Sequence, residues 1–222
     1  MTRGIEVVSG SRHRGIFLLV AISFLPLTGC LQFAANLMHV MSGPQVPAEF
    51  KGLDGKRVAI LSNNESGICR DESTIRLAGN LKGILAGKLP KATFVRQDEI
   101  DSWLDGKSSR DQDFVAIGEA VKADYLISVE MLDLKLKDGQ TLFRGRSNLT
   151  VRVWDVKSSK IAFQKSLPEY TYPIMAGQAT TETDEPKFRR VYLMNVADKI
   201  GRYFYAHEFG EDVAMDATIL HY

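Results

Sequence analysis

The sequence has few of the residues from which metal and disulfide sites are built. Among 222 residues there are two cysteines and four histidines. No histidine stands at zinc-ligand spacing from a second histidine or a cysteine, and two cysteines cannot form the disulfide framework of a small secreted domain. We therefore expect no metal site and no fold held by disulfide bonds.

An excess of charge of one sign is also missing. Lysine and arginine number 28, aspartate and glutamate 27, and the formal net charge is +1. Proteins that bind nucleic acid usually carry a basic field. The composition therefore predicts no nucleic-acid partner.

The motifs of common enzymes are absent as well. The polar stretch Ser62–Gly67 follows an apolar strand but contains neither of the glycine patterns that cradle phosphates, and the chain has no Gly-x-Ser-x-Gly elbow. Several aspartates stand at strand ends and turns, where aspartate is favoured for structural reasons: Asp54, Asp124, Asp133 and Asp155. We expect no catalytic residue, no cofactor and a protein that is not an enzyme.

The longest apolar run lies near the start of the chain and is short. Arginines at positions 3, 12 and 14 precede Ile16–Leu25, which is the order of a secretory signal peptide. The run is shorter than the roughly 20 residues of a transmembrane helix. Leu27–Cys30 then reads Leu-Thr-Gly-Cys and resembles the lipobox of bacterial lipoproteins, in which the cysteine thiol is diacylglycerylated and the chain is cut before it.

The lipobox resemblance implies cleavage between Gly29 and Cys30 and a lipid on Cys30. The alternative is an uncleaved signal anchor with an incidental cysteine. Because anchoring by more than one acyl chain is stable, the mature chain would be bound to a membrane without spanning it. Leu31 stands where lipoproteins of the inner membrane often carry aspartate, so the resemblance favours an outer membrane, on the side facing the periplasm.

Two neighbouring features depend on this lipidation. With Cys30 acylated, Cys69 has no partner, and it is either a reactive thiol beside Arg70 or, as free cysteines more often are, a small buried apolar residue. The apolar segment Leu31–Met41 forms either a short helix in the membrane interface or a helix packed on the protein's own domain.

The chain divides into four expected parts. Ser42–Pro47 contains two prolines and a glycine, which end any helix before it. The expected parts are a lipoprotein signal peptide (1–29), a lipid-anchored tether with a short apolar helix (30–49), a single α/β domain (50–207) and a C-terminal tail (208–222).

The first half of the domain alternates strands with helices. The hydrophobic pattern predicts strands at 58–61, 92–96 and 125–131 and helices at 73–89, 97–104 and 114–122. In the first helix, Ser73 or Thr74 is the expected N-cap. Its expected apolar face consists of Ile75, Ala78, Leu81, Leu85 and Leu89.

The second half predicts an antiparallel meander. Asp138-Gly139 is a hairpin turn between the alternating stretch 132–137 and a long strand at 141–155. Leu149, Val151 and Val153 are expected on one side of that strand. A further strand at 161–166, a crossing at 167–173 and a mobile polar loop at 174–186 follow. The last helix starts near Phe188. Its expected apolar side is Val191, Met194, Val196, Ala197, Ile200, Phe204 and Tyr205, and its expected solvated side is Arg189, Arg190, Lys199 and Arg202.

These elements predict the α/β (α+β) class. The sheet is expected to be mixed, beginning with β-α-β units and ending in the meander, and to be packed by helices that include a long C-terminal one. Asn63, Asn64 and Glu65 follow the first strand, where open α/β sheets place ligands, and form a possible ligand loop. Six aromatic residues supply either a binding surface or the core and rim of the last helix: Tyr170, Tyr172, Tyr192, Tyr203, Phe204 and Tyr205.

Three stretches carry a family resemblance over residues 50–207. Gly55–Leu61 reads Gly-Lys-Arg-Val-Ala-Ile-Leu, Ala123–Glu130 reads Ala-Asp-Tyr-Leu-Ile-Ser-Val-Glu, and residues 149–161 read as two strands with a turn. Together they resemble the α/β domain of CsgG-like lipoproteins of curli secretion and of penicillin-binding-protein-activator lipoproteins. Glu130 stands where those families usually have glycine, and no pair of amphipathic membrane-hairpin segments of a curli-type pore is seen.

The order of the N-terminal pieces carries a second resemblance. A lipobox, an apolar helix, a Val-Pro-Ala-Glu-Phe tether and a Gly-Lys-Arg-Val strand resemble uncharacterised lipoproteins of Planctomycetes-type bacteria. The resemblances imply a non-enzymatic lipoprotein of the cell envelope whose periplasm-facing domain binds or assembles with other envelope proteins. The alternative is a domain that binds or hydrolyses a small ligand near Asn64.

The lipid anchor gives the first testable prediction. Wild-type protein should incorporate a palmitate analogue and sediment with membranes, whereas Cys30→Ala should do neither, because only a thiol accepts the diacylglyceryl group. Cys69→Ala is the matched control and should keep both properties. A wild-type protein without lipid would contradict the predicted anchor.

Overall fold

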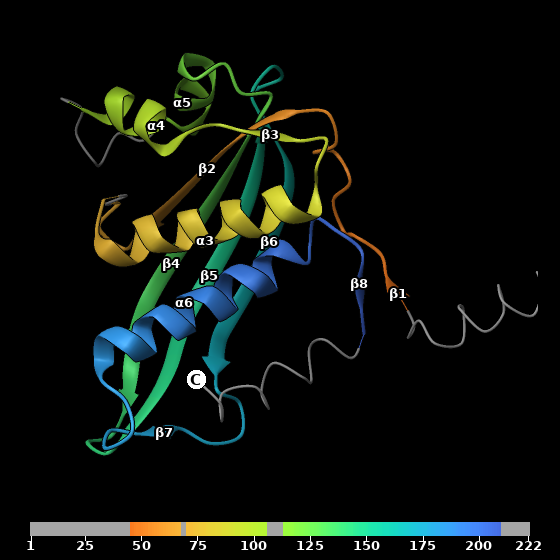
Figure 1. Cartoon of the computed structure of the whole chain (residues 1–222). Coiled ribbons are helices and arrows are strands. Elements are labelled where there is room, and N and C mark those ends of the chain that lie inside the picture. The colour runs from red at the N-terminus through yellow and green to blue at the C-terminus, as the bar shows by residue number, and fades with distance from the viewer. Residues whose placement is uncertain (1–44, 68–69, 106–112, 210–222) are drawn as a thin grey trace, which may run out of the picture. The chain divides into compact units, whose positions relative to one another are not determined.

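The protein is described by a computed structural model that covers residues 45–67, 70–105 and 113–209 (Figure 1). The lipobox at Leu27–Cys30, the apolar segment Leu31–Met41 and Cys69 lie outside the described residues. The division into signal peptide, tether, domain and tail stays a prediction.

A six-stranded mixed sheet forms the centre of the domain (Figure 1). Its strand order is β3-β2-β4-β5-β6, with β7 paired to β5; β2 is parallel to β3 and β4, whereas β4, β5, β6 and β7 pair antiparallel. The strands are β2 (Arg57–Asn64), β3 (Thr93–Phe94), β4 (Tyr125–Asp138), β5 (Leu142–Asp155), β6 (Lys160–Tyr172) and β7 (Gln178–Ala179). The predicted fold class is confirmed.

Helices pack on both faces of this sheet. The helices are α3 (Glu72–Lys88), α4 (Gln97–Leu104), α5 (Phe114–Ala120) and α6 (Glu185–Gly201). The main core lies between the sheet and the pair α3 and α6, and a second core lies under α4 and α5 on the opposite face (Figure 1). A separate two-stranded sheet joins β1 (Gln45–Val46) to β8 (His207–Glu208).

Period-two alternation in the long strands decides which face is apolar. Leu149, Val151 and Val153 of β5 are buried in the main core, as the sequence predicted, together with Ile127 and Val129 of β4. The residues between them point to the other face. One face of the sheet therefore has to be covered by helices, and α3 and α6 cover it.

Helix α3 begins earlier than the sequence indicated. Its N-cap is Asp71, whose carboxylate accepts hydrogen bonds from the backbone N–H groups of Ser73 and Thr74 at 2.8 and 3.1 Å. The predicted cap at Ser73 or Thr74 was therefore wrong. Ile75, expected on the buried face, is 44% exposed, and Leu77 takes its place in the core, because the buried face is aligned with Thr74, Leu77 and Leu81.

Several strands extend beyond their predicted ends. Strand β2 continues through Asn63 and Asn64, which were expected in a loop, because they pair with Glu130 and Met131 of β4. Strand β6 runs to Tyr172 through the expected crossing. Within the expected loop 174–186, β7 pairs with β5 and α6 begins at Glu185. The mobility of that loop stays a prediction.

The last helix lies where the sequence predicted it, but two residues were assigned to the wrong side. Met194, expected to be buried, is 47% exposed, and Arg202, expected to be solvated, is 5% exposed. Arg202 follows the helix and its guanidinium lies 2.6 Å from the carboxylate of Asp198. Five of the six singled-out aromatic residues are buried and join the main core, which confirms the core interpretation: Tyr172, Tyr192, Tyr203, Phe204 and Tyr205.

Tyr192 of α6 lies directly on the backbone of Gly145 in β5. A Cβ atom at residue 145 would lie 2.0 Å from the Tyr192 ring. The Tyr192 hydroxyl and the Ser147 hydroxyl are 2.6 Å apart, and the Tyr192 hydroxyl donates to the carbonyl of Tyr170 at 3.2 Å. Burial raises the pKa of Tyr192 well above its ordinary value, so the phenol stays protonated. This contact positions α6 on the sheet.

Two glycine substitutions test this packing. Gly145→Ala should lower the free energy of unfolding by about 3 kcal/mol, the upper end of typical overpacking costs, because the buried ring has no room to move. Gly83→Ala is the matched control: Gly83 lies inside α3 and its added methyl group would contact nothing within 4 Å. It should raise stability by roughly 0.5–1 kcal/mol. Urea unfolding of the chain from residue 31 measures both, and equal effects would contradict the packing described here.

Candidate interaction surfaces

The possible ligand loop is brought together by the structure, and two of its three side chains bond within the fold. Asn63 is buried in β2, and its Oδ1 has no hydrogen-bond partner among the described residues. The Asn64 amide donates to the Asp71 carboxylate at 2.9 Å, and its oxygen accepts from the Ser66 N–H at 3.0 Å. The Glu65 carboxylate accepts from the backbone N–H of Asp133. Asn64 and Glu65 thus connect the end of β2 to the N-cap of α3 and to β4.

Two of the four aspartates that the sequence placed at strand ends and turns accept hydrogen bonds from the backbone. Asp124 accepts from the N–H of Arg57 at 2.8 Å, and Asp155 accepts from the N–H of Ser158 at 3.0 Å. The described ranges contain no group of three or more His, Cys, Asp or Glu residues that could hold a metal ion. No helix within those ranges is long and apolar enough to cross a membrane.

The sheet face opposite α3 and α6 is polar along β4 and β5. Glu130 of β4 pairs with Arg152 of β5 at 3.2 Å, and the indole N–H of Trp154 donates to the Ser128 hydroxyl at 3.0 Å. Glu130 is the residue that replaces the glycine of the resembled families, and here it forms a cross-strand ion pair. Helices α4 and α5 contact this face near Trp154.

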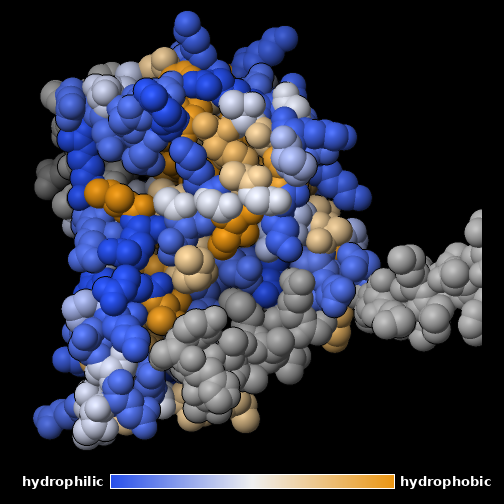
Figure 2. Space-filling model, in the orientation of Figure 1, coloured by the Kyte–Doolittle hydropathy of each residue, from blue (hydrophilic) through white to orange (hydrophobic). Residues whose placement is uncertain are grey.

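On the face that carries α3 and α6, apolar surface occurs in separate patches between polar and charged residues (Figure 2). The large exposed apolar residues of these two helices are Ile75 and Met194. Charged side chains between them are paired, as in the ion pair of Arg189 with Glu185 at 2.7 Å. This face therefore has the character of an ordinary solvated surface.

An apolar tip lies at the end of the domain where the β4–β5 hairpin turns. We define the apolar tip as Leu142, Ile174 and Met175. The Ile174 and Met175 side chains are 57% and 86% exposed. Arg144 of β5 donates from Nε to the carbonyl of Pro173 at 3.2 Å and from Nη2 to the carbonyl of Ile174 at 2.7 Å. These bonds fix the backbone that presents the two side chains.

A hollow of about 310 Å³ between β4 and the start of α6 has most of its charges in ion pairs. It is lined by Leu134, Lys135, Leu136, Lys137, Glu185 and Arg189. Glu185 lies 2.7 Å from Arg189 and 3.7 Å from Lys137. The hydrogen bond from Arg189 holds the pKa of Glu185 below its usual value. Three cationic side chains thus surround one carboxylate, which pairs with two of them.

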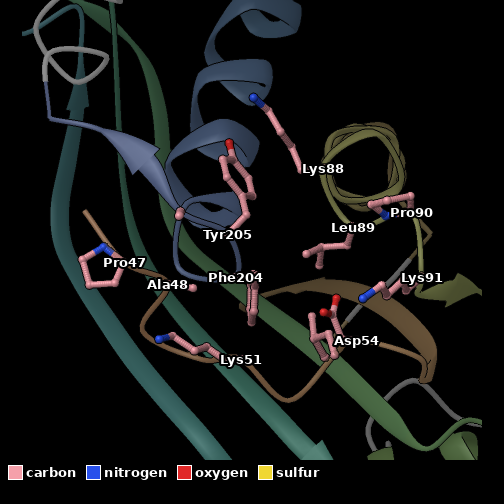
Figure 3. A pocket seen from close by; sticks show the side chains of 12 residues that line it. Pro47, Ala48, Lys51, Asp54, Lys88, Leu89, Pro90, Lys91, Phe204 and Tyr205 are labelled. Atoms are coloured by element: carbon pink, nitrogen blue, oxygen red, sulfur yellow. The ribbon is translucent and has the colours of Figure 1, made fainter. Parts of the chain in front are cut away.

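A larger pocket of about 460 Å³ lies at the opposite end of the domain (Figure 3). It stands beside the start of β2 and the end of α3. Lys51, Lys88 and Lys91 line it together with buried Leu53 and Phe204. We call it the lysine pocket. Its residues come from three segments far apart in the chain, and no local pattern in the sequence could have indicated it.

Comparisons with known proteins complete this description. No protein-family model matches the chain, and no curated protein matches it by sequence. Among solved structures, the chain is similar to the PelC dodecamer from Paraburkholderia phytofirmans, at 9% identity and a TM-score of 0.44 over 73% of this chain and 97% of that one. It is similar to lipoprotein GNA1162 from Neisseria meningitidis, at 10% identity and a TM-score of 0.43 over 65% of this chain and 96% of that one. It is also similar to the C-terminal domain of LpoB from Salmonella enterica, at 15% identity and a TM-score of 0.37 over 52% of this chain and 84% of that one.

Proposed function

We propose that the chain is a lipid-anchored lipoprotein of the cell envelope, not an enzyme, whose periplasm-facing α/β domain binds or assembles with other envelope proteins. The lipobox pattern at Leu27–Cys30 supports the anchor. The observation that carries protein binding is the apolar tip, which exposes two large adjacent apolar side chains on a backbone held in place.

The exposed side chains of the apolar tip gain the favourable free energy of burial only when a partner covers them. Burial of apolar surface contributes about 25 cal/mol for each Å² removed from water, so Ile174 and Met175 leave favourable free energy available to a partner. Methionine adapts its shape to different surfaces and is frequent at binding sites. A partner that covered both side chains would gain a compact apolar contact of the kind that dominates interface energies.

The surroundings of the apolar tip have the polar rim of an interface. Asp138 accepts from Arg146 at 2.7 Å and lies 3.7 Å from Arg144. Arg144 in turn donates hydrogen bonds to the carbonyls of Pro173 and Ile174. Because Arg144 already holds these two carbonyls, binding of a partner would restrict the loop less than it would restrict a loop without such bonds.

Site-specific photocrosslinking tests partner binding directly. A photoreactive amino acid at position 175 of the full-length protein, expressed in its own cells, should give one or a few adducts of defined mass. The matched control is position 158, which is exposed in the turn between β5 and β6, and it should give none. Mass spectrometry of the adducts identifies the partner. A protein that forms no adduct from position 175 and runs as a strict monomer would overturn the proposal.

The alternative of ligand binding near Asn64 has its own test. Asn64→Ala with Glu65→Ala should lower the free energy of unfolding by about 1–3 kcal/mol, since each substitution removes hydrogen bonds worth about 1 kcal/mol. The crosslinks from position 175 should persist. Urea unfolding and crosslinking of the same double variant measure both effects. Unchanged stability together with the loss of a bound small ligand or of a hydrolytic activity would favour the alternative.

A further inference from the structure

Positive charge without a partner gathers at the lysine pocket. Within the described part of the chain, Lys51, Lys88 and Lys91 have no carboxylate within ion-pair distance. Asp54 is the single acidic residue among the described residues of the lining. Three ammonium groups against one carboxylate leave the pocket with an excess of positive charge.

Several other basic residues of the domain pair with a carboxylate. Arg57 lies 2.7 Å from Glu99, Arg152 lies 3.2 Å from Glu130, and Lys165 lies 2.9 Å from Glu49. Exposed lysines elsewhere in the described residues also lack a carboxylate partner, but at the lysine pocket three of them line one cavity. The charge at this end is therefore available to an anionic ligand.

The lysine pocket combines this charge with an apolar floor. Leu53 and Phe204 are buried at its base, and Leu89 packs against the same core. Figure 3 shows Lys51 on one segment and Lys88 and Lys91 on another, at the end of α3, with the Lys88 side chain beside Tyr205. The Lys88 ammonium lies 5.2 Å from the centre of the Tyr205 ring. A cationic rim over an apolar floor suits an amphipathic anion.

The number of residues between Cys30 and the pocket indicates which kind of anionic ligand lies within reach. Pro47 and Ala48 themselves line the pocket. The next residues are fixed there, because the Phe50 N–H donates to the carbonyl of Tyr203 at 2.9 Å and the Phe50 ring packs edge-on to Phe204. Between Cys30 and Pro47 the chain can extend over about 60 Å at most. A lipid on Cys30 would keep the pocket within that reach of the membrane surface.

We propose that the lysine pocket binds the headgroup of an anionic phospholipid in the membrane that holds the anchor. The lysines pair with the phosphate as point charges, and the glycerol and first methylene groups rest on Leu53 and Phe204. The proposal rests on the proposed lipid anchor. It adds a second membrane contact, which would direct the pocket end of the domain to the bilayer and the apolar tip away from it.

Thermal unfolding of the purified protein in a neutral detergent tests this binding whether or not Cys30 carries a lipid, and it needs no partner protein. Dihexanoyl-phosphatidylglycerol should raise the unfolding midpoint, because a ligand that binds only the folded state stabilises it. Dihexanoyl-phosphatidylcholine, which has no net charge, should raise it much less. Sodium phosphate at the same concentration separates a lipid headgroup from a free phosphate ion.

Matched lysine variants assign the effect to the pocket. Replacement of Lys51, Lys88 and Lys91 by Gln should weaken phosphatidylglycerol binding about 5-fold for each lysine and roughly 100-fold together. The control replaces three exposed lysines that do not line the pocket by Gln, with the same change of net charge: Lys122, Lys157 and Lys160. The control variant should bind within about twofold of wild type.

Three results would overturn the proposal. One is an equal response to the two lipids, and another is an equal response to sodium phosphate and phosphatidylglycerol. The third is a response that appears only after residues 210–222 are removed. It would indicate that this segment, which contains Glu211, Asp212 and Asp216, is the anionic occupant of the pocket in the intact chain. Each leaves palmitate labelling of Cys30 and crosslinking from position 175 unaffected, so this failure is distinguishable from failure of the proposed function.

Discussion

The contact of the Tyr192 ring with the backbone of Gly145 sets the arrangement of the domain. It places α6 on β5, and the hydroxyl of the same residue reaches Ser147 and the carbonyl of Tyr170, so one side chain ties the helix to two strands. Helix α3 then packs beside α6, where Gly201 lies close to Ile84. With both helices placed, the apolar face of the sheet is covered, and what remains exposed is its polar face and its two ends.

The two ends differ in chemistry and lie far apart. The lysine pocket stands beside the start of β2, where β4 also begins, and the apolar tip stands where β4 turns into β5. Strand β4 has 14 residues, and a strand rises about 3.3 Å per residue, which separates the ends by roughly 45 Å. A domain held at its basic end would therefore present Ile174 and Met175 well away from the surface to which it is anchored.

The sequence predicted the parts of the fold that depend on local patterns. Alternation in β5 and the Asp138-Gly139 turn identified the hairpin because both signals lie within a few residues of each other. The extension of β2 through Asn63 and Asn64 could not be read in this way, because their extended geometry comes from pairing with Glu130 and Met131, about 67 residues later. The same holds for the candidate surfaces: the lysine pocket joins segments around residues 51, 90 and 204, and Met175 lies in a stretch whose composition is that of a polar loop.

The place where α/β sheets usually bind ligands is closed in this domain. At the carboxyl end of β2, Asn64 binds Asp71 and Ser66, and Glu65 binds the backbone of β4. Strand β4 continues for seven residues beyond Met131, the partner of Asn64, so its long hairpin with β5 extends past this end of β2. The side chains of Asn64 and Glu65, which stand where such sheets direct polar groups at a ligand, are here bonded to the chain itself. The two surfaces proposed for recognition lie instead at the ends of the sheet, at the lysine pocket and the apolar tip.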